Sequence, residues 1–282
     1  MEVLKVNYRS PESPERFCQS LKTTGFAVIT DHPIPMELVN RVYQQWSDFF
    51  KSEEKHKYTF EPNDQAGYFP FRSENAKNYS IKDLKEFFHV YPRSKLPASL
   101  EKDTWDLYNQ ITKLGCELLN WVQVASPADV KKLFSMPLSD MVTNSEENLL
   151  RVIHYPPLQG NEEDGAIRAA AHEDINLITL LCSATSAGLE VKDIEGNWHT
   201  VPCDPGSIAI NAGDMLQMAS KGYYKSTTHR VINPKGPDSK LPRYSMPLFL
   251  HPRPEVVLAE GVTSGGYLKQ RLEEIGLLKK KG

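Results

Sequence analysis

The chain has 282 residues, of which 40% are hydrophobic and 24% are charged, a balance typical of a globular protein that buries a large core. Its 33 basic and 36 acidic residues give a net charge of −3, so composition offers no general reason to expect nucleic acid or an anionic membrane as a partner. No apolar run approaches the roughly 20 residues that a bilayer requires, and the first residues lack the features of a signal peptide. Four widely spaced cysteines are expected to be buried thiols, which predicts a cytoplasmic protein.

The first half of the chain has mainly helical patterns. A proline after Ser13 predicts the start of a helix that Gly25 ends, and residues 26–30 follow as a short buried strand. Apolar residues at helical spacing predict a second helix from about Met36 and a long one after Pro97. We expect the leucine and aromatic faces of these helices to form core.

From about Leu149 the pattern changes to short β-prone runs separated by Gly and Pro. Such spacing predicts a sandwich or a double-sheet jelly roll. Ser126 has the spacing of a capping box and predicts a further short helix, while residues 267–278 predict a closing helix before a solvated lysine tail at 279–281. The β-prone runs are 149–155, 177–181, 188–192, 198–201, 207–210, 227–232 and 244–250.

Three residues in the β-rich half form a candidate metal site. In an extended chain His172 and Asp174 project from the same face, while Glu173 points away. A His-x-Asp pair alone is as often structural as it is metal-binding. A third candidate ligand, His229, lies in a second β-like run and strengthens the case for a metal site. Two histidines and one carboxylate from different strands form the facial triad of non-haem iron(II) oxygenases, which leaves three neighbouring positions open. The sequence therefore predicts His172, Asp174 and His229 as iron ligands.

Arg243 and Ser245 form a candidate anion site a little further along the chain, on one face of a predicted strand. A guanidinium matches a carboxylate in shape, and a hydroxyl two residues on adds a third hydrogen bond. In isolation, Arg243 would be interpreted as an ordinary surface arginine on an edge strand. Beside an iron site it suits the distal carboxylate of a dicarboxylic keto acid whose other end chelates the metal.

Taken together, these motifs resemble the iron(II)- and 2-oxoglutarate-dependent dioxygenases of the isopenicillin N synthase-like family, particularly its bacterial members. The resemblance covers nearly the whole chain and is carried by residues 21–57, 67–71, 83–88, 210–216 and 229–231.

This resemblance implies a mixed α and β fold, a double-stranded β-helix (distorted jelly-roll) core wrapped by N-terminal and C-terminal helices. Residues 1–282 are then one oxygenase unit. Its N-terminal dioxygenase region covers about residues 1–110, and its catalytic jelly-roll core with the metal site covers about residues 148–252.

The implied activity couples oxidative decarboxylation of 2-oxoglutarate to hydroxylation, desaturation or cyclisation of a small molecule. The implied cofactors are Fe(II), 2-oxoglutarate and O2, with ascorbate as an additional option. Arg243, Ser245 and Tyr155 are expected at the 2-oxoglutarate site. Two departures from the family pattern are Ile153, where many plant members have asparagine, and Lys221, where asparagine is also common.

Candidate substrate contacts come from the same resemblance. Aromatic residues on segments that lie over the barrel mouth in the family, together with an arginine that precedes the metal strand and suits an acidic substrate, are expected near the substrate. For each of them, core packing or surface exposure is a competing explanation. The candidates are Tyr68, Phe69, Phe71, Phe88 and Arg168.

Other functions remain open at this point. Isopenicillin N synthase and aminocyclopropane carboxylate oxidase share the triad and the Arg-x-Ser pair without using 2-oxoglutarate. A zinc hydrolase also uses two histidines and an aspartate, and a jelly roll can be a binding module without activity. We expect a small-molecule substrate and no nucleic-acid or membrane partner, and the sequence predicts no oligomeric state.

Overall fold

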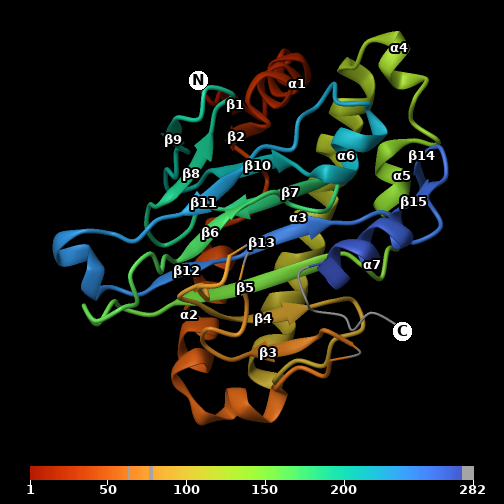
Figure 1. Cartoon of the computed structure of the whole chain (residues 1–282). Helices are drawn as coiled ribbons and strands as arrows, with labels where there is room; N and C mark the ends of the chain where they lie inside the picture. Colours follow the sequence, from red (N-terminus) through yellow and green to blue (C-terminus); the bar gives the residue numbers. More distant parts are fainter. Residues whose placement is uncertain (63, 76–78, 275–282) are drawn as a thin grey trace.

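The computed structural model of the chain describes residues 1–62, 64–75 and 79–274, and it contains two β-sheets with helices covering the outer face of the larger one (Figure 1). No helix among these residues is both long and apolar enough to cross a membrane. The α-helices are α1 (Ser13–Thr24), α2 (Met36–Lys51), α3 (Ala98–Ala125), α4 (Ala128–Lys131), α5 (Leu138–Val142), α6 (Asp214–Ala219) and α7 (Ser264–Glu274), and the 3-10 helices are η1 (Glu53–Tyr58) and η2 (Gly236–Lys240).

The strands form one large sheet, one small sheet and a hairpin. The larger sheet has the order β1-β2-β10-β7-β13-β5-β4-β3, with β12 also paired to β5, and the smaller has the order β6-β11-β8-β9. The strands are β1 (Lys5–Asn7), β2 (Phe26–Thr30), β3 (Gly67–Phe69), β4 (Glu86–Val90), β5 (Leu149–Tyr155), β6 (Ala169–His172), β7 (Ile178–Cys182), β8 (Leu189–Lys192), β9 (Trp198–Thr200), β10 (Ile208–Ala212), β11 (His229–Val231), β12 (Arg243–Ser245), β13 (Pro247–Leu250), β14 (Val257–Ala259) and β15 (Val262–Thr263).

Two hydrophobic cores follow from this arrangement. One lies between the sheets and contains residues of both, such as Phe26 and Phe87 of the larger sheet and Val191 of the smaller. The other lies between the larger sheet and the helices and includes Trp46 of α2. The predicted fold class, a jelly-roll core wrapped by helices, is confirmed.

Alternation along β5 determines which side chains face the space between the sheets. Tyr155 and Ile153 belong to the inner core, and their partners across the antiparallel β5–β12 pair are Arg243 and Ser245. Directly opposed residues of an antiparallel pair lie on the same face of the sheet. The predicted carboxylate-binding pair therefore lies between the two sheets and not on an exposed edge.

The predicted helices α1, α2 and α3 are present, and Gly25 ends α1 in the left-handed conformation with φ 73°. The predicted capping role of Ser126 is wrong. Its hydroxyl donates to the carbonyl of Val122 at the end of α3, and Pro127 takes the N-cap position of α4. Serine next to a helix end can satisfy carbonyls behind it as well as amides ahead of it, and the spacing did not distinguish the two.

The first half of the chain contributes more strand than the mainly helical prediction allowed. β1 pairs with β2, while β3 and β4 extend the sheet beyond β5. All five residues of β4 are buried, because this strand is covered on both faces. α7 is described to Glu274, and the rest of the predicted closing helix and the tail at 279–281 lie outside the described residues.

Candidate metal centre and cosubstrate pocket

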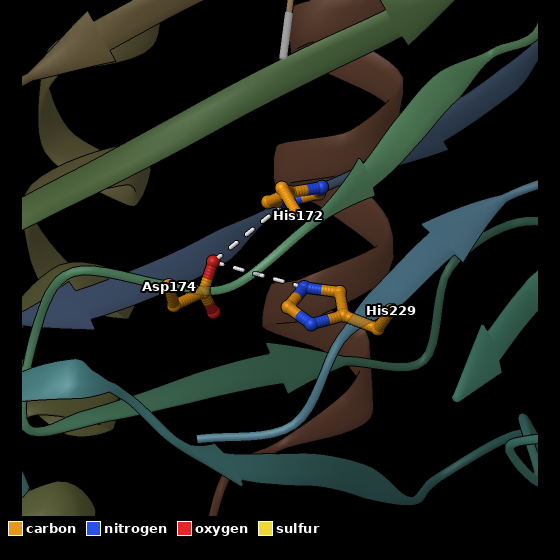
Figure 2. Close-up of side chains that lie close together, drawn as sticks. All are labelled: His172, Asp174 and His229. Carbon is orange, nitrogen blue, oxygen red and sulfur yellow. Dashed lines mark ion pairs between the residues drawn. The ribbon is translucent and has the colours of Figure 1, made fainter. Parts of the chain in front are cut away.

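The three predicted metal ligands converge. His172 at the end of β6 lies directly opposite His229 at the start of β11, and Asp174 follows β6 by two residues. Their ligand atoms all lie within 4.8 Å of one another. Figure 2 shows one oxygen of Asp174 facing both rings, with Oδ1 lying 3.8 Å from Nε2 of His172 and 3.7 Å from Nε2 of His229. Three donors around one point fit a small divalent cation.

Main-chain carbonyls determine which nitrogen of each ring is available. Nδ1 of His172 lies 2.7 Å from the carbonyl oxygen of Ala170, and Nδ1 of His229 lies 3.1 Å from that of Thr227. A carbonyl can only accept, so each Nδ1 carries the proton and each Nε2 presents its lone pair to the centre. Burial, and then the neighbouring His229, lowers the pKa of His172, which favours the neutral form that binds metals.

The carboxylate of Asp174 is fixed by two donors that the sequence did not single out. Thr179 on β7 and Asn211 on β10 both donate to Oδ2, at 2.5 and 2.7 Å. Burial alone would raise the pKa of Asp174, but the two histidines and these two donors outweigh it and hold the pKa below its usual value. Because Oδ2 already accepts two hydrogen bonds, Oδ1 is the oxygen left for a metal. The aspartate is therefore arranged as a monodentate ligand.

Arg243 provides a buried cation without a counterion. Its side chain is only 1% exposed, its Nε donates to the carbonyl of Ser186 at 3.0 Å, and its buried Nη1 has no partner. Among the described residues, no carboxylate pairs with it. The guanidinium carbon lies 5.1 Å from the centre of the Tyr155 ring, and the buried Ser245 lies two residues along the strand. Burying an unpaired charge costs several kcal/mol, so this arrangement fits an anionic ligand.

Comparison with known proteins gives the same interpretation. Residues 146–252 match the model of the 2OG-Fe(II) oxygenase superfamily, and residues 8–112 match that of the N-terminal region of non-haem dioxygenases, described from morphine synthesis. The proline hydroxylase buaE of Petromyces alliaceus is 30% identical over 290 residues, covering 91% of this chain and 89% of that protein. The chain belongs to the 2OG-Fe(II) oxygenase superfamily. Iron(II) and 2-oxoglutarate are the metal and cosubstrate typical of this superfamily of oxidoreductases.

Solved structures of bacterial proteins agree. A Shewanella oneidensis protein assigned as an oxygenase is 50% identical, with a TM-score of 0.89 over 99% of this chain and 100% of that one. A 2OG-Fe(II) oxygenase family protein of Caulobacter crescentus is 28% identical, with a TM-score of 0.80 over 97% and 99% of the two chains.

A cavity of about 670 Å³ opens onto the metal centre of this oxygenase. His172 and Asp174 are part of its wall, together with Phe249 of β13 and residues of α7 such as Leu268 and Arg271. Its position beside the triad makes it the natural place for a substrate. None of the five residues predicted to contact the substrate is part of this wall.

Paired charges form much of this wall. Lys85 lies 2.8 Å from both Glu74 and Asp83, and Arg151 lies 3.1 Å from Glu74. Arg151 also donates to Nε2 of His89 at 2.8 Å, and burial lowers the pKa of His89 well below its usual value, so this imidazole is a neutral acceptor. Two cations face two carboxylates. This part of the wall therefore presents polar groups whose charges balance.

The aromatic residues predicted to meet the substrate lie outside this wall as the described residues define it. Tyr68 donates to Glu86 at 2.5 Å and Phe88 packs on Trp46 in the outer core. Phe69 stacks between Phe60 and Phe87 in the inner core, and Phe71 is 46% exposed. Tyr68, Phe69 and Phe88 have their contacts elsewhere and Phe71 is exposed, so substrate contact stays a prediction without support from the cavity.

Arg168 also lies outside the cavity wall, buried near Arg243.

Some of the wall residues that the sequence analysis did not single out left a signal in the sequence. Lys85 lies in a segment that carried the family resemblance, and Arg151 shares its face of β5 with Tyr155.

Proposed function

We propose that the protein is an iron(II)- and 2-oxoglutarate-dependent oxygenase that couples oxidative decarboxylation of 2-oxoglutarate to hydroxylation of a small polar molecule. The observation that carries the proposal is the pairing of a buried His-Asp-His triad with the buried, uncompensated guanidinium of Arg243. One centre suits a metal that needs open positions, and the other suits the remote carboxylate of a keto acid bound to it.

The roles of the residues follow from their free atoms. His172 and His229 would hold the metal through Nε2 and Asp174 would hold it through Oδ1, and a facial triad of this kind leaves positions open for the cosubstrate and O2. Iron(II) supplies the oxidising chemistry when bound. Arg243 and Ser245 hold the distal carboxylate and so orient the keto acid from its far end.

Arg243 also bears on the main alternative, a relative that uses the iron triad without 2-oxoglutarate. Such an enzyme still needs an anion to neutralise this guanidinium, and no described side chain provides one. The dicarboxylate satisfies both centres with one molecule. The zinc hydrolase alternative assigns no role to Arg243, which lies outside the cavity wall.

The cavity supports a compact substrate rich in hydrogen-bonding groups. The charges of Glu74, Lys85 and Arg151 in its wall are already paired with one another, which favours a neutral or zwitterionic molecule over a strongly charged one at this part of the cavity. The likeness to the proline hydroxylase buaE supports hydroxylation over desaturation or cyclisation as the reaction.

Anaerobic titration tests the proposal. Adding 2-oxoglutarate to the iron(II) protein should produce the visible charge-transfer band of the chelate, and His229→Ala should abolish it while remaining folded. Succinate release should then depend on 2-oxoglutarate and rise with the right member of a library of amino acids and other polar metabolites. A wild-type protein that binds iron(II) but gives neither band nor succinate would contradict the proposal.

A further inference from the structure

A second buried arginine lies beside the first. Arg168 precedes β6 and is 1% exposed, like Arg243. Its guanidinium carbon lies 5.9 Å from the centre of the same Tyr155 ring that lies 5.1 Å from the guanidinium carbon of Arg243. Both guanidinium groups therefore lie near the same aromatic ring, close enough for the charge of Arg243 to act on Arg168.

Neither guanidinium is neutralised by the described part of the chain. Arg168 donates through Nη2 to the carbonyl of Leu241 at 3.1 Å, while its buried Nε has no partner. Arg243 has one carbonyl partner and an unpartnered Nη1. Burial, and then the charge of Arg243, lowers the pKa of Arg168 to about 10, which is the effect expected when like charges are desolvated together. Carbonyl dipoles and a ring face do not balance two full charges.

The position of Arg168 is fixed by its surroundings. Its main-chain amide donates to Oδ1 of Asn233 at 3.0 Å, and Nδ2 of Asn233 donates in turn to the carbonyl of Ala166 at 2.8 Å. Leu241, which accepts from its side chain, lies two residues before Arg243. The side chain of Arg168 is therefore held by the segment that leads into β12, the strand that carries Arg243.

We propose that Arg168 is a second cosubstrate-binding residue, which together with Arg243 forms a two-arginine pocket for the distal carboxylate of 2-oxoglutarate. This inference rests on the proposed function. It replaces the expectation that Arg168 meets an acidic substrate, because the residue lies outside the wall of the substrate cavity. The pocket selects dicarboxylic keto acids, since a keto acid without the distal carboxylate leaves two cations buried and unpaired.

The experiment compares two keto acids that differ only in that carboxylate. Iron(II) protein is titrated anaerobically with 2-oxoglutarate and with 2-oxopentanoate, and the Kd of each is measured from the chelate band or by calorimetry. Arg168→Gln should raise the Kd for 2-oxoglutarate about 10- to 100-fold and change that for 2-oxopentanoate less than about twofold. The Kd for iron(II) should stay unchanged.

Two further variants keep the result interpretable. Arg168→Lys retains the charge and should recover part of the affinity for 2-oxoglutarate, and Arg41→Gln, on the exposed surface of α2, should leave every Kd unchanged. An unchanged Kd for 2-oxoglutarate in Arg168→Gln would overturn the inference, as would equal losses for both keto acids, which would show a purely structural role. Absence of the band in the wild-type protein would instead overturn the proposed function.

Discussion

The hydroxyl of Thr179 helps to fix the orientation of the Asp174 carboxylate at the metal centre. It donates to Oδ2 of Asp174, the oxygen that does not face the histidines, and Asn211 donates to the same atom. Thr179→Val keeps the β-branched shape and removes one of these two donors. The carboxylate then rotates more freely, and Oδ1 is less firmly presented to the metal.

The expected loss of metal affinity can be estimated from the bond to Asp174. The same hydroxyl also accepts a hydrogen bond from Nδ2 of Asn176 at 3.0 Å, but that amide keeps its second partner, the carbonyl of Ile178. Hydrogen-bond partners of metal ligands are worth about 10- to 100-fold in metal affinity, or roughly 1.4 to 2.7 kcal/mol. Because Asn211 keeps its bond to Asp174, we expect the lower part of this range, about 10- to 30-fold. The metal-free protein should also lose about 1.5 kcal/mol of unfolding free energy, since a hydrogen bond to a buried carboxylate is lost.

Thr179→Ser is the matched control, because it keeps the hydroxyl and loses only a methyl group. Anaerobic binding of Mn(II) or Fe(II), followed by calorimetry, gives the metal affinity of each variant, and urea unfolding of the metal-free proteins gives their stability. The serine variant should bind metal nearly as well as the wild type. Equal metal affinity for the valine and serine variants would refute the idea that Oδ2 must be held by donors.

Three other changes test different parts of the structure. Glu86→Ala leaves the ammonium of Lys55 without the carboxylate that lies 3.0 Å away and should lower the unfolding free energy by roughly 3 kcal/mol in urea; a loss below about 1 kcal/mol would contradict this. Gly213→Ala places a methyl carbon 2.2 Å from the carbonyl oxygen of Asn176 and should cost about 1 to 3 kcal/mol and weaken metal binding, whereas unchanged melting and metal affinity would show that the loop has room. Burial lowers the pKa of His251 to about 4, so as the pH falls from about 6.5 to 4 this histidine becomes protonated in the unfolded chain before it does in the folded one. Over this range the free energy of unfolding of the metal-free protein should fall by up to about 3 kcal/mol, and that of His251→Gln should not show this fall. Parallel profiles of stability against pH for the two proteins would rule this out.

The convergence of the His-Asp-His triad could be predicted because its signal is local and chemical. His172 and Asp174 lie on one face of an extended segment, and few other functions need that pair together with a downstream histidine. The donors to Asp174 were less visible. Thr179 and Asn211 lie on neighbouring strands of the larger sheet, directly opposite each other in register, and only the pairing of β7 with β10 brings both to one oxygen.

The aromatic residues show how register decides function. Tyr68 and Phe88 are paired across β3 and β4 and face the helices, while Phe69 and Phe87, one residue along, face the space between the sheets. A shift of one residue moves a side chain to the opposite face, and the sequence of this short segment does not determine that register.

The wall of the cavity beside the triad was not predictable for a similar reason. Its ion pairs join Glu74 in a loop to Lys85 and to Arg151 of β5, three segments that are brought together by sheet order and not by proximity along the chain.

A crystal structure of the protein grown anaerobically with Fe(II) and 2-oxoglutarate tests the central claim most directly. It should show the metal bound by Nε2 of both histidines and by Oδ1 alone of Asp174, with the distal carboxylate of the keto acid against Arg243. A metal bound elsewhere, or a 2-oxoglutarate carboxylate that leaves Arg243 unpaired, would contradict it.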